Sequence, residues 1–126
     1  MKTTDRNIMQ QEIKRYESNA RMTRAVQFGD LVFIGGQTSD DEAADIRTQT
    51  AQVLSKVDKY LQMVGIDSTR ILSAQVWLAD IAADYDAMNE VWDEWVPEGH
   101  TPARATVQAT LASPALRVEI AVVAAK

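Results

Sequence analysis

The spacing of apolar and polar residues along the chain predicts a small domain built from both strands and helices. Two short β-prone runs, residues 25–28 and 31–35, flank Gly29 and Asp30. A glycine-containing pair between two such runs is typical of a β-hairpin turn. The apolar run at 71–81 predicts a further strand, and its apolar residues fall on both faces, as in a strand covered on two sides.

Two segments have the period of amphipathic helices. Residues 42–64 predict the first, with Gly65 as its C-terminal cap, and residues 84–96 predict the second, which Pro97 ends. In the first helix, the apolar stripe consists of Ile46, Val53, Leu54, Val57, Leu61 and Val64. In the second, one stripe consists of Tyr85, Met88, Asn89, Trp92, Trp95 and Val96. Each helix therefore has one face suited to packing against a sheet.

The last third of the chain predicts two more strands. Residues 104–111 alternate between apolar and polar, whereas residues 117–125 are apolar on both faces apart from Glu119. The resulting order, β-β-α-β-α-β-β, predicts an α+β fold with the helices on one face of a sheet. Residues 1–12 are expected to form a mobile arm, and residues 13–126 a single domain.

Composition narrows the chemistry that the domain can perform. The 126 residues include no Cys and one His, His100, so thiolate chemistry and His-based metal clusters are excluded. The net charge of −5 disfavours nucleic-acid binding, because phosphate backbones repel an acidic surface. Neither a signal peptide nor a membrane span is evident, so a cytoplasmic protein is expected. Catalysis would have to use Arg, Asp, Glu, amides, hydroxyls and water.

Glu119 is the first candidate for such chemistry. A carboxylate within a strand of Val, Ile and Ala is costly to bury unless it is paired or hydrogen-bonded. It is either an edge-strand or subunit-contact residue that faces water, or a group held in a cleft to position water or move a proton.

Arg104 is the second candidate. It follows Pro102 and Ala103 at the start of a predicted strand. Arginine grips carboxylates through two parallel hydrogen bonds, a geometry that Lys lacks. It is either a surface residue at a strand end or part of a ligand site. If the last two strands pair as a hairpin, Arg104 and Glu119 would share one site or form a salt bridge.

The glycine pair and one asparagine each have both a structural and a functional interpretation. Gly35 and Gly36 indicate either a bulge with close packing or bare backbone amides open to a ligand oxygen. Asn89, a polar residue on an apolar stripe, either satisfies a buried backbone group or points into a pocket. His100 and the three Trp residues are interpreted as loop-bracing and as core or subunit-contact residues, respectively.

Taken in order, several segments resemble the Rid family, also called the RidA/YjgF/YER057c-type proteins. The resemblance extends from about Arg15 to Ala125. It rests on the segments GDLVFIGGQ, SAQVWLADI, YDAMNEVWDEWV, GHTPARATVQATL and RVEIAVVAA. The most diagnostic features are Gly-Gly-Gln, Met-Asn, Pro-Ala-Arg and Val-Glu-Ile.

The resemblance implies a chorismate-mutase-like fold and a cofactor-free activity. Family members form homotrimers with a central β-barrel and clefts between subunits. Active members hydrolyse reactive imines and enamines, such as 2-iminopropanoate and 2-iminobutanoate, to 2-oxo acids and ammonia. The resemblance thus implies self-association, a small carboxylate-bearing substrate, and a functional link to pyridoxal-phosphate enzymes or amino-acid oxidases. It implies neither a metal nor an organic cofactor.

The resemblance also implies roles for individual residues. Arg104 matches the arginine that grips the substrate carboxylate, and Glu119 the glutamate that orients the attacking water. Gly36 matches a glycine whose backbone lies against the ligand, and Asn89 matches a cleft asparagine. Two positions depart from the pattern: Thr106 stands where many active members have Cys, and Met22 where many have Tyr. A backbone amide at 106 would still serve the carboxylate.

These departures leave three alternatives to a general imine deaminase. One is a non-catalytic trimer that binds small carboxylates, and another is a deaminase for one pathway-specific enamine. The third is an endoribonuclease, an activity attached to some relatives, which the acidic balance disfavours.

Overall fold

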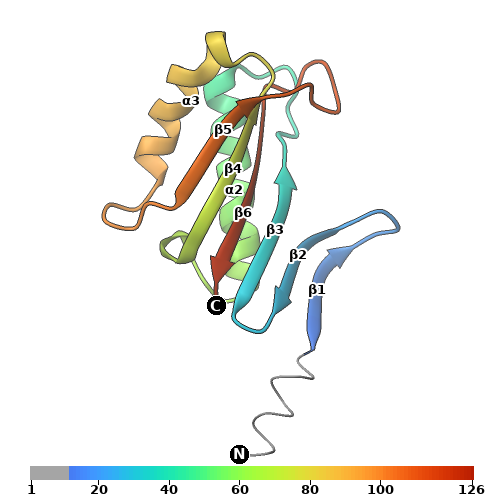
Figure 1. Cartoon of the computed structure of the whole chain (residues 1–126). Helices are drawn as coiled ribbons and strands as arrows, with labels where there is room; N and C mark the ends of the chain where they lie inside the picture. Colours follow the sequence, from blue (N-terminus) through green and yellow to red (C-terminus); the bar gives the residue numbers. More distant parts are fainter. Residues whose placement is uncertain (1–11) are drawn as a thin grey trace, which may run out of the picture.

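The computed structural model describes residues 12–126 and consists of one sheet with two α-helices on the same side of it (Figure 1). The expected arm at 1–12 lies outside the described residues except for Glu12, which belongs to no helix or strand. The six strands run in the order β1-β2-β3-β6-β4-β5 across the sheet. Their bounds are β1 Ile13–Ser18, β2 Thr23–Phe28, β3 Leu31–Gln37, β4 Ile71–Leu78, β5 Ala103–Gln108 and β6 Val118–Ala125. The predicted α+β architecture is confirmed.

Both predicted helices are present, and each begins at an aspartate cap. Helix α2 spans Ile46–Met63 after Asp45, whose carboxylate accepts a hydrogen bond from the Thr48 amide at 2.8 Å. Helix α3 spans Ile81–Trp95 after Asp80, which caps the Ala83 amide in the same way. Such caps satisfy amides that the first helical turn leaves without partners. A short 3₁₀ helix, η1 Ser68–Arg70, leads into β4.

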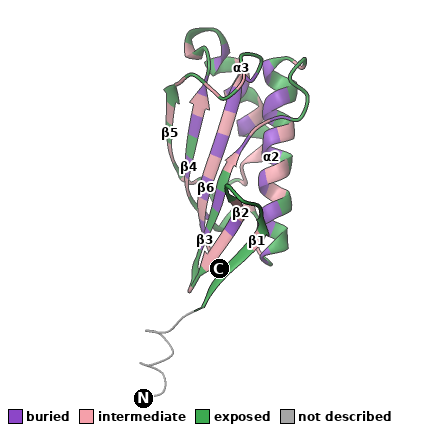
Figure 2. Cartoon of the chain, turned by 90° about the vertical axis from the view of Figure 1, so that its right-hand side faces the viewer, coloured by how far each residue is buried: buried purple, intermediate pink, exposed green. Residues whose placement is uncertain are grey.

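The hydrophobic core lies between the sheet and the helices (Figure 2). In β6, alternate residues are buried, with Val118, Ile120 and Val122 packed toward the helices. Strand β6, which lies between β3 and β4, therefore packs one entire face against the core. On the helix side, Val53, Leu54, Val57 and Leu61 of α2 are buried, as their helical spacing predicted.

The opposite face of the sheet is covered by no helix among the described residues. Its outward side chains include Phe33, Ala121 and Val123, and Phe33 is 42% exposed. The register pairs Phe33 with Val123, which places both on this face. We call this surface the open face of the sheet. An apolar face of this kind is typical of a surface that another chain covers.

The predicted order of elements is wrong at the N-terminal end, because a strand precedes the hairpin. Strand β1 pairs antiparallel with β2 at the edge of the sheet. Its sequence is IKRYES, and only Tyr16 is partly buried. A strand with so little apolar alternation gives no periodic signal, so only its pairing with β2 reveals it.

No helix among residues 12–126 is both long and apolar enough to cross a membrane.

Candidate functional site

Glu119 lies in the centre of the sheet, beside Gly36. Strand β6 is flanked by β3 and β4, so the edge-strand interpretation of Glu119 is wrong. The alternation of β6 places Glu119 on the open face, opposite Trp77 of β4. A Cβ atom at position 36 would lie 3.0 Å from Cδ of Glu119 and would overlap its Oε2 atom. The carboxylate thus occupies the space that the absent side chain of Gly36 leaves.

Gly36 is required for space and not for a special backbone conformation. Its φ is not positive, unlike that of Gly29, Gly65 and Gly99. The pairing of β3 with β6 shifts register between Ile34 and Gln37, which is the bulge that the two glycines indicated. The bulge and the close approach of Glu119 therefore occur together at this point of the strand.

Arg104 lies on the other side of the sheet, near the start of β5. It pairs in parallel register with Ala74, whose side chain is buried toward the helices. Its guanidinium Cζ lies 5.0 Å from the ring centroid of Trp92, a residue of α3. The ion pairs among residues 12–126 involve neither Arg104 nor Glu119. Arg104 also lines a cleft of about 230 Å³ over the start of β4 and β5.

Asn89 and Thr106 lie on the same side as Arg104. Thr106 is two residues further along β5 and pairs with the buried Val76. Its hydroxyl oxygen is buried without a hydrogen-bond partner among residues 12–126. Asn89 precedes Trp92 by one helical turn, so the two share a side of α3, and Asn89 is half-buried.

Met22 lies in the turn between β1 and β2 and is 51% exposed. Its backbone amide donates to Asn19 Oδ1 at 3.0 Å, and its sulfur accepts from Arg24 Nη1 at 3.4 Å. These hydrogen bonds are local to the hairpin.

The structure does not bring all the predicted site residues together within one chain. The expected pairing of the last two strands as a hairpin is wrong, because β4 lies between β5 and β6. Arg104 and Glu119 accordingly point to opposite faces of the sheet and form no salt bridge. Glu119 and Gly36 form one cluster on the open face. The other is the contact between Arg104 and Trp92 on the helix side of the sheet, where Asn89 and Thr106 also lie. A single site that contains both charges would need a second copy of the chain.

Comparison with known proteins identifies the family. The model of the family described as Endoribonuclease L-PSP matches residues 12–126. The chain belongs to this family. The resemblance to the RidA/YjgF proteins is thereby confirmed, since a solved YjgF-family protein of Neisseria meningitidis is 40% identical, with a TM-score of 0.88 over 91% of this chain and 95% of that chain. A solved protein of Pseudomonas aeruginosa is 44% identical, also with a TM-score of 0.88, over 91% and 99%.

Relatives in this family carry names of different kinds. A protein of Haemophilus ducreyi, named only as a RutC family protein, is 42% identical over 90% of this chain and 96% of its own length. A protein of Capra hircus named 2-iminobutanoate/2-iminopropanoate deaminase is 31% identical over 81% and 77%. Of these two relatives, the one named for an activity is thus the less similar to this chain.

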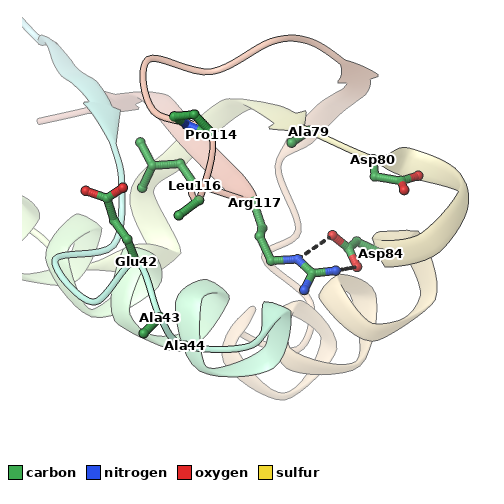
Figure 3. Close-up of a pocket in the computed structure, with 10 residues that line it drawn as sticks. Glu42, Ala43, Ala44, Ala79, Asp80, Asp84, Pro114, Leu116 and Arg117 are labelled. Atoms are coloured by element: carbon green, nitrogen blue, oxygen red, sulfur yellow. Dashed lines mark hydrogen bonds and ion pairs between the residues drawn. The ribbon is translucent and has the colours of Figure 1, made fainter.

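A further pocket, of about 410 Å³, lies beyond the C-terminal end of β4 (Figure 3). It was missed in the sequence because its two main residues are 33 positions apart. Arg117 donates from Nε to Asp84 at 3.0 Å and from Nη2 at 2.7 Å. The hydrogen bonds to Asp84 raise the pKa of the Arg117 guanidinium above its ordinary value.

Charge argues against this pocket as the site of a small anion. Glu42, Asp80 and Asp84 line it, against the single guanidinium of Arg117. The Asp84 side chain is 3% exposed, so the pair fastens the segment before β6 to α3. No group of three or more metal-ligating side chains occurs among residues 12–126. Within this member of the family, the pocket is therefore best explained as structural.

Proposed function

We propose that the protein hydrolyses reactive 2-imino acids and their enamine tautomers to 2-oxo acids and ammonia. The observation that carries the proposal is the carboxylate of Glu119, which lies unpaired in the central strand against Gly36. The carboxylate is partly exposed on the open face, where water can reach it, and this position suits a water-activating role. The deaminase name of the Capra hircus relative supports the same activity.

The working unit that we propose is a homotrimer with sites between subunits. Apolar side chains of the open face, Phe33 and Val123 among them, would meet around a central barrel. Glu119 would then face a cleft that also contains Arg104 of a neighbouring copy. This arrangement accounts for the two clusters that one chain keeps apart, because each cleft would combine one cluster from each of two copies.

The chemistry needs only binding, a water molecule and a base. Arg104 would bind the substrate carboxylate through two N–H donors. Glu119 would accept a proton from water as the oxygen adds to the C=N carbon, which gives a carbinolamine. The proton passes from Glu119 to nitrogen to complete the carbinolamine. Glu119 would then take the proton of the new hydroxyl and deliver it to nitrogen as the C–N bond breaks, so that ammonia leaves and the C=O bond of the 2-oxo acid forms. Positioning together with one general base typically accelerates such a step by about 10²–10⁴-fold.

Asn89, Thr106 and Met22 would shape the site without taking part in proton transfer. Met22 supplies no hydroxyl at the rim of the cleft, and Thr106 supplies a backbone amide beside the arginine. We propose that these two residues adjust substrate preference. The enzymes that would supply the imine are pyridoxal-phosphate enzymes or amino-acid oxidases, since both release 2-imino acids.

The test is an imine-trapping assay with an amino-acid oxidase as the source of the imine. Semicarbazide traps the free imine, so an active deaminase lowers the rate of semicarbazone formation. Arg104→Ala and Glu119→Gln are expected to lose at least about 10²-fold of the acceleration. The matched controls are Arg15→Ala and Glu98→Gln, which change the same residue types at exposed positions.

The outcomes of this assay distinguish the proposed deaminase from its alternatives and test the assigned site residues. If wild type leaves trapping unchanged but calorimetry detects 2-oxobutanoate binding, the protein binds small carboxylates and is not a deaminase for these imines. If Arg104→Ala and Glu119→Gln match wild type while trapping is reduced, the activity stands and the assigned site is wrong. Activity limited to longer or cyclic enamines would favour the pathway-specific alternative.

A further inference from the structure

Trp92 provides the contact that holds the side chain of Arg104. The guanidinium Cζ lies 5.0 Å from the centroid of the indole ring, and Trp92 is only 6% exposed. A guanidinium over an aromatic face at this separation is a cation–π contact. Because the two residues come from α3 and β5, this contact connects the helix layer to the edge of the sheet.

The kind of contact matters for what Arg104 can bind. A carboxylate partner would use the N–H donors of the guanidinium and neutralise its charge. The ring of Trp92 carries no charge and no carboxylate oxygen, so this contact leaves the charge of the guanidinium unneutralised. No ion pair among residues 12–126 involves Arg104, so its charge is not neutralised by another side chain of this part of the chain.

Trp92 is itself held by a second layer of contacts. The ring of Trp95 packs against it, with centroids 5.3 Å apart and planes tilted by 54°. The Trp95 indole Nε1 donates to Asp58 Oδ2 of α2 at 2.9 Å. Burial raises the pKa of Asp58 above its ordinary value, although the hydrogen bond from Trp95 opposes the shift. The two rings are thereby fixed between α2 and α3.

We propose that Trp92 is the positioning residue of the carboxylate-binding site: its ring holds Arg104 in place without neutralising the charge that the ligand carboxylate binds. Trp92 touches the arginine and not the reacting atoms, so it acts through Arg104. The inference rests on the proposed function, because Arg104 is assigned there to the substrate carboxylate.

The experiment is a double-mutant cycle on binding of 2-oxobutanoate, measured by calorimetry. Trp92→Leu is expected to raise the Kd by about 3- to 30-fold, the range of a partly desolvated cation–π contact. Trp92→Phe, which keeps an aromatic face, is expected to restore part of the affinity. With Arg104→Ala already present, Trp92→Leu is expected to change the Kd by less than about twofold, since the contact it removes is gone.

Val91→Ala is the control for a general effect on α3. Val91 is partly buried against the core and has no aromatic ring to form a cation–π contact, so its truncation should lower the Tm and leave the Kd unchanged. In the imine assay, Trp92→Leu is expected to raise KM more than it lowers kcat, because it disturbs the grip on the carboxylate and not the attack of water.

The outcomes separate this inference from the proposed function. An unchanged Kd in Trp92→Leu, or an equal effect with and without Arg104, would give Trp92 a structural role only. Binding without imine hydrolysis would reject the deaminase and still support the positioning role through the cycle. Imine hydrolysis without measurable 2-oxobutanoate binding, with a KM unchanged by Trp92→Leu, would reject the positioning role and retain the deaminase.

Discussion

At the scale of single residues, the most specific feature is the complementarity of Gly36 and Glu119. A side chain at 36 and the observed position of the carboxylate are mutually exclusive. The obstructing atom is the end of a flexible side chain, so Glu119 can move aside when the space is filled. The functional cost of filling this space should therefore exceed the structural cost.

Gly36→Ala is expected to lower imine hydrolysis by about 10²-fold, the contribution of a positioned general base, with little change in Tm. The matched control is Gly35→Ala, whose added Cβ would lie an ordinary 3.5 Å from the Thr23 carbonyl oxygen. Steady-state kinetics and thermal unfolding measure the two effects. If Gly36→Ala still costs activity when Glu119→Ala is already present, the glycine acts on something other than this carboxylate.

At the scale of elements, the pair of Asp84 and Arg117 connects α3 to the start of β6. The two side chains differ in burial, because the aspartate is 3% exposed and the arginine is 41% exposed. Removing the arginine leaves a buried charge without a partner, whereas removing the aspartate leaves a charge that water can reach.

Arg117→Met is therefore expected to destabilise the fold by about 3 kcal/mol and Asp84→Asn by about 1 kcal/mol at neutral pH. Urea unfolding measures both. The double variant should cost less than the sum of the single variants, because neither charge is then left unpaired. Equal costs for the two single variants would contradict the argument from unequal burial.

At the scale of the whole molecule, the proposed site requires copies of the chain to associate through the open face of the sheet. Only then would Glu119 of one copy lie near Arg104 of another. Helices α2 and α3 cover only the other face (Figure 1). The proposed trimer would bury Val123 and Phe33, which lie opposite each other in β6 and β3.

Val123→Asp is expected to reduce the solution mass from about three times that of the 14.0 kDa chain to that of one chain. Burying three carboxylates at a dry interface without partners is the physical reason. The control is Met63→Asp, at a residue of α2 that is 38% exposed on the helix layer. Sedimentation equilibrium measures the mass. A wild-type protein that sediments as a single chain would reject the proposed assembly.

Local pattern alone determined much of this protein. Helical spacing located α2 and α3, and Gly29 and Gly65 adopt the positive φ that their predicted turn and cap positions require. Residue types nominated Arg104 and Glu119, because a carboxylate in an apolar strand and an arginine at a strand start suit proton transfer and carboxylate binding. The predictions of the helices, the turn and the cap succeeded because helix period and turn residues depend on neighbours in the sequence, whereas the roles of Arg104 and Glu119 stay predictions.

Only the tertiary structure decided which residues meet. Strand order is set by long-range pairing, so the sequence suggested a hairpin of the last two strands where β4 lies between them. The same order turns Arg104 toward the helices and Glu119 toward the open face. The contact between Trp92 and Arg104 crosses from helix to sheet, and no spacing along the chain encodes it. The sequence could therefore nominate candidate residues one at a time, whereas their arrangement depended on packing between distant segments.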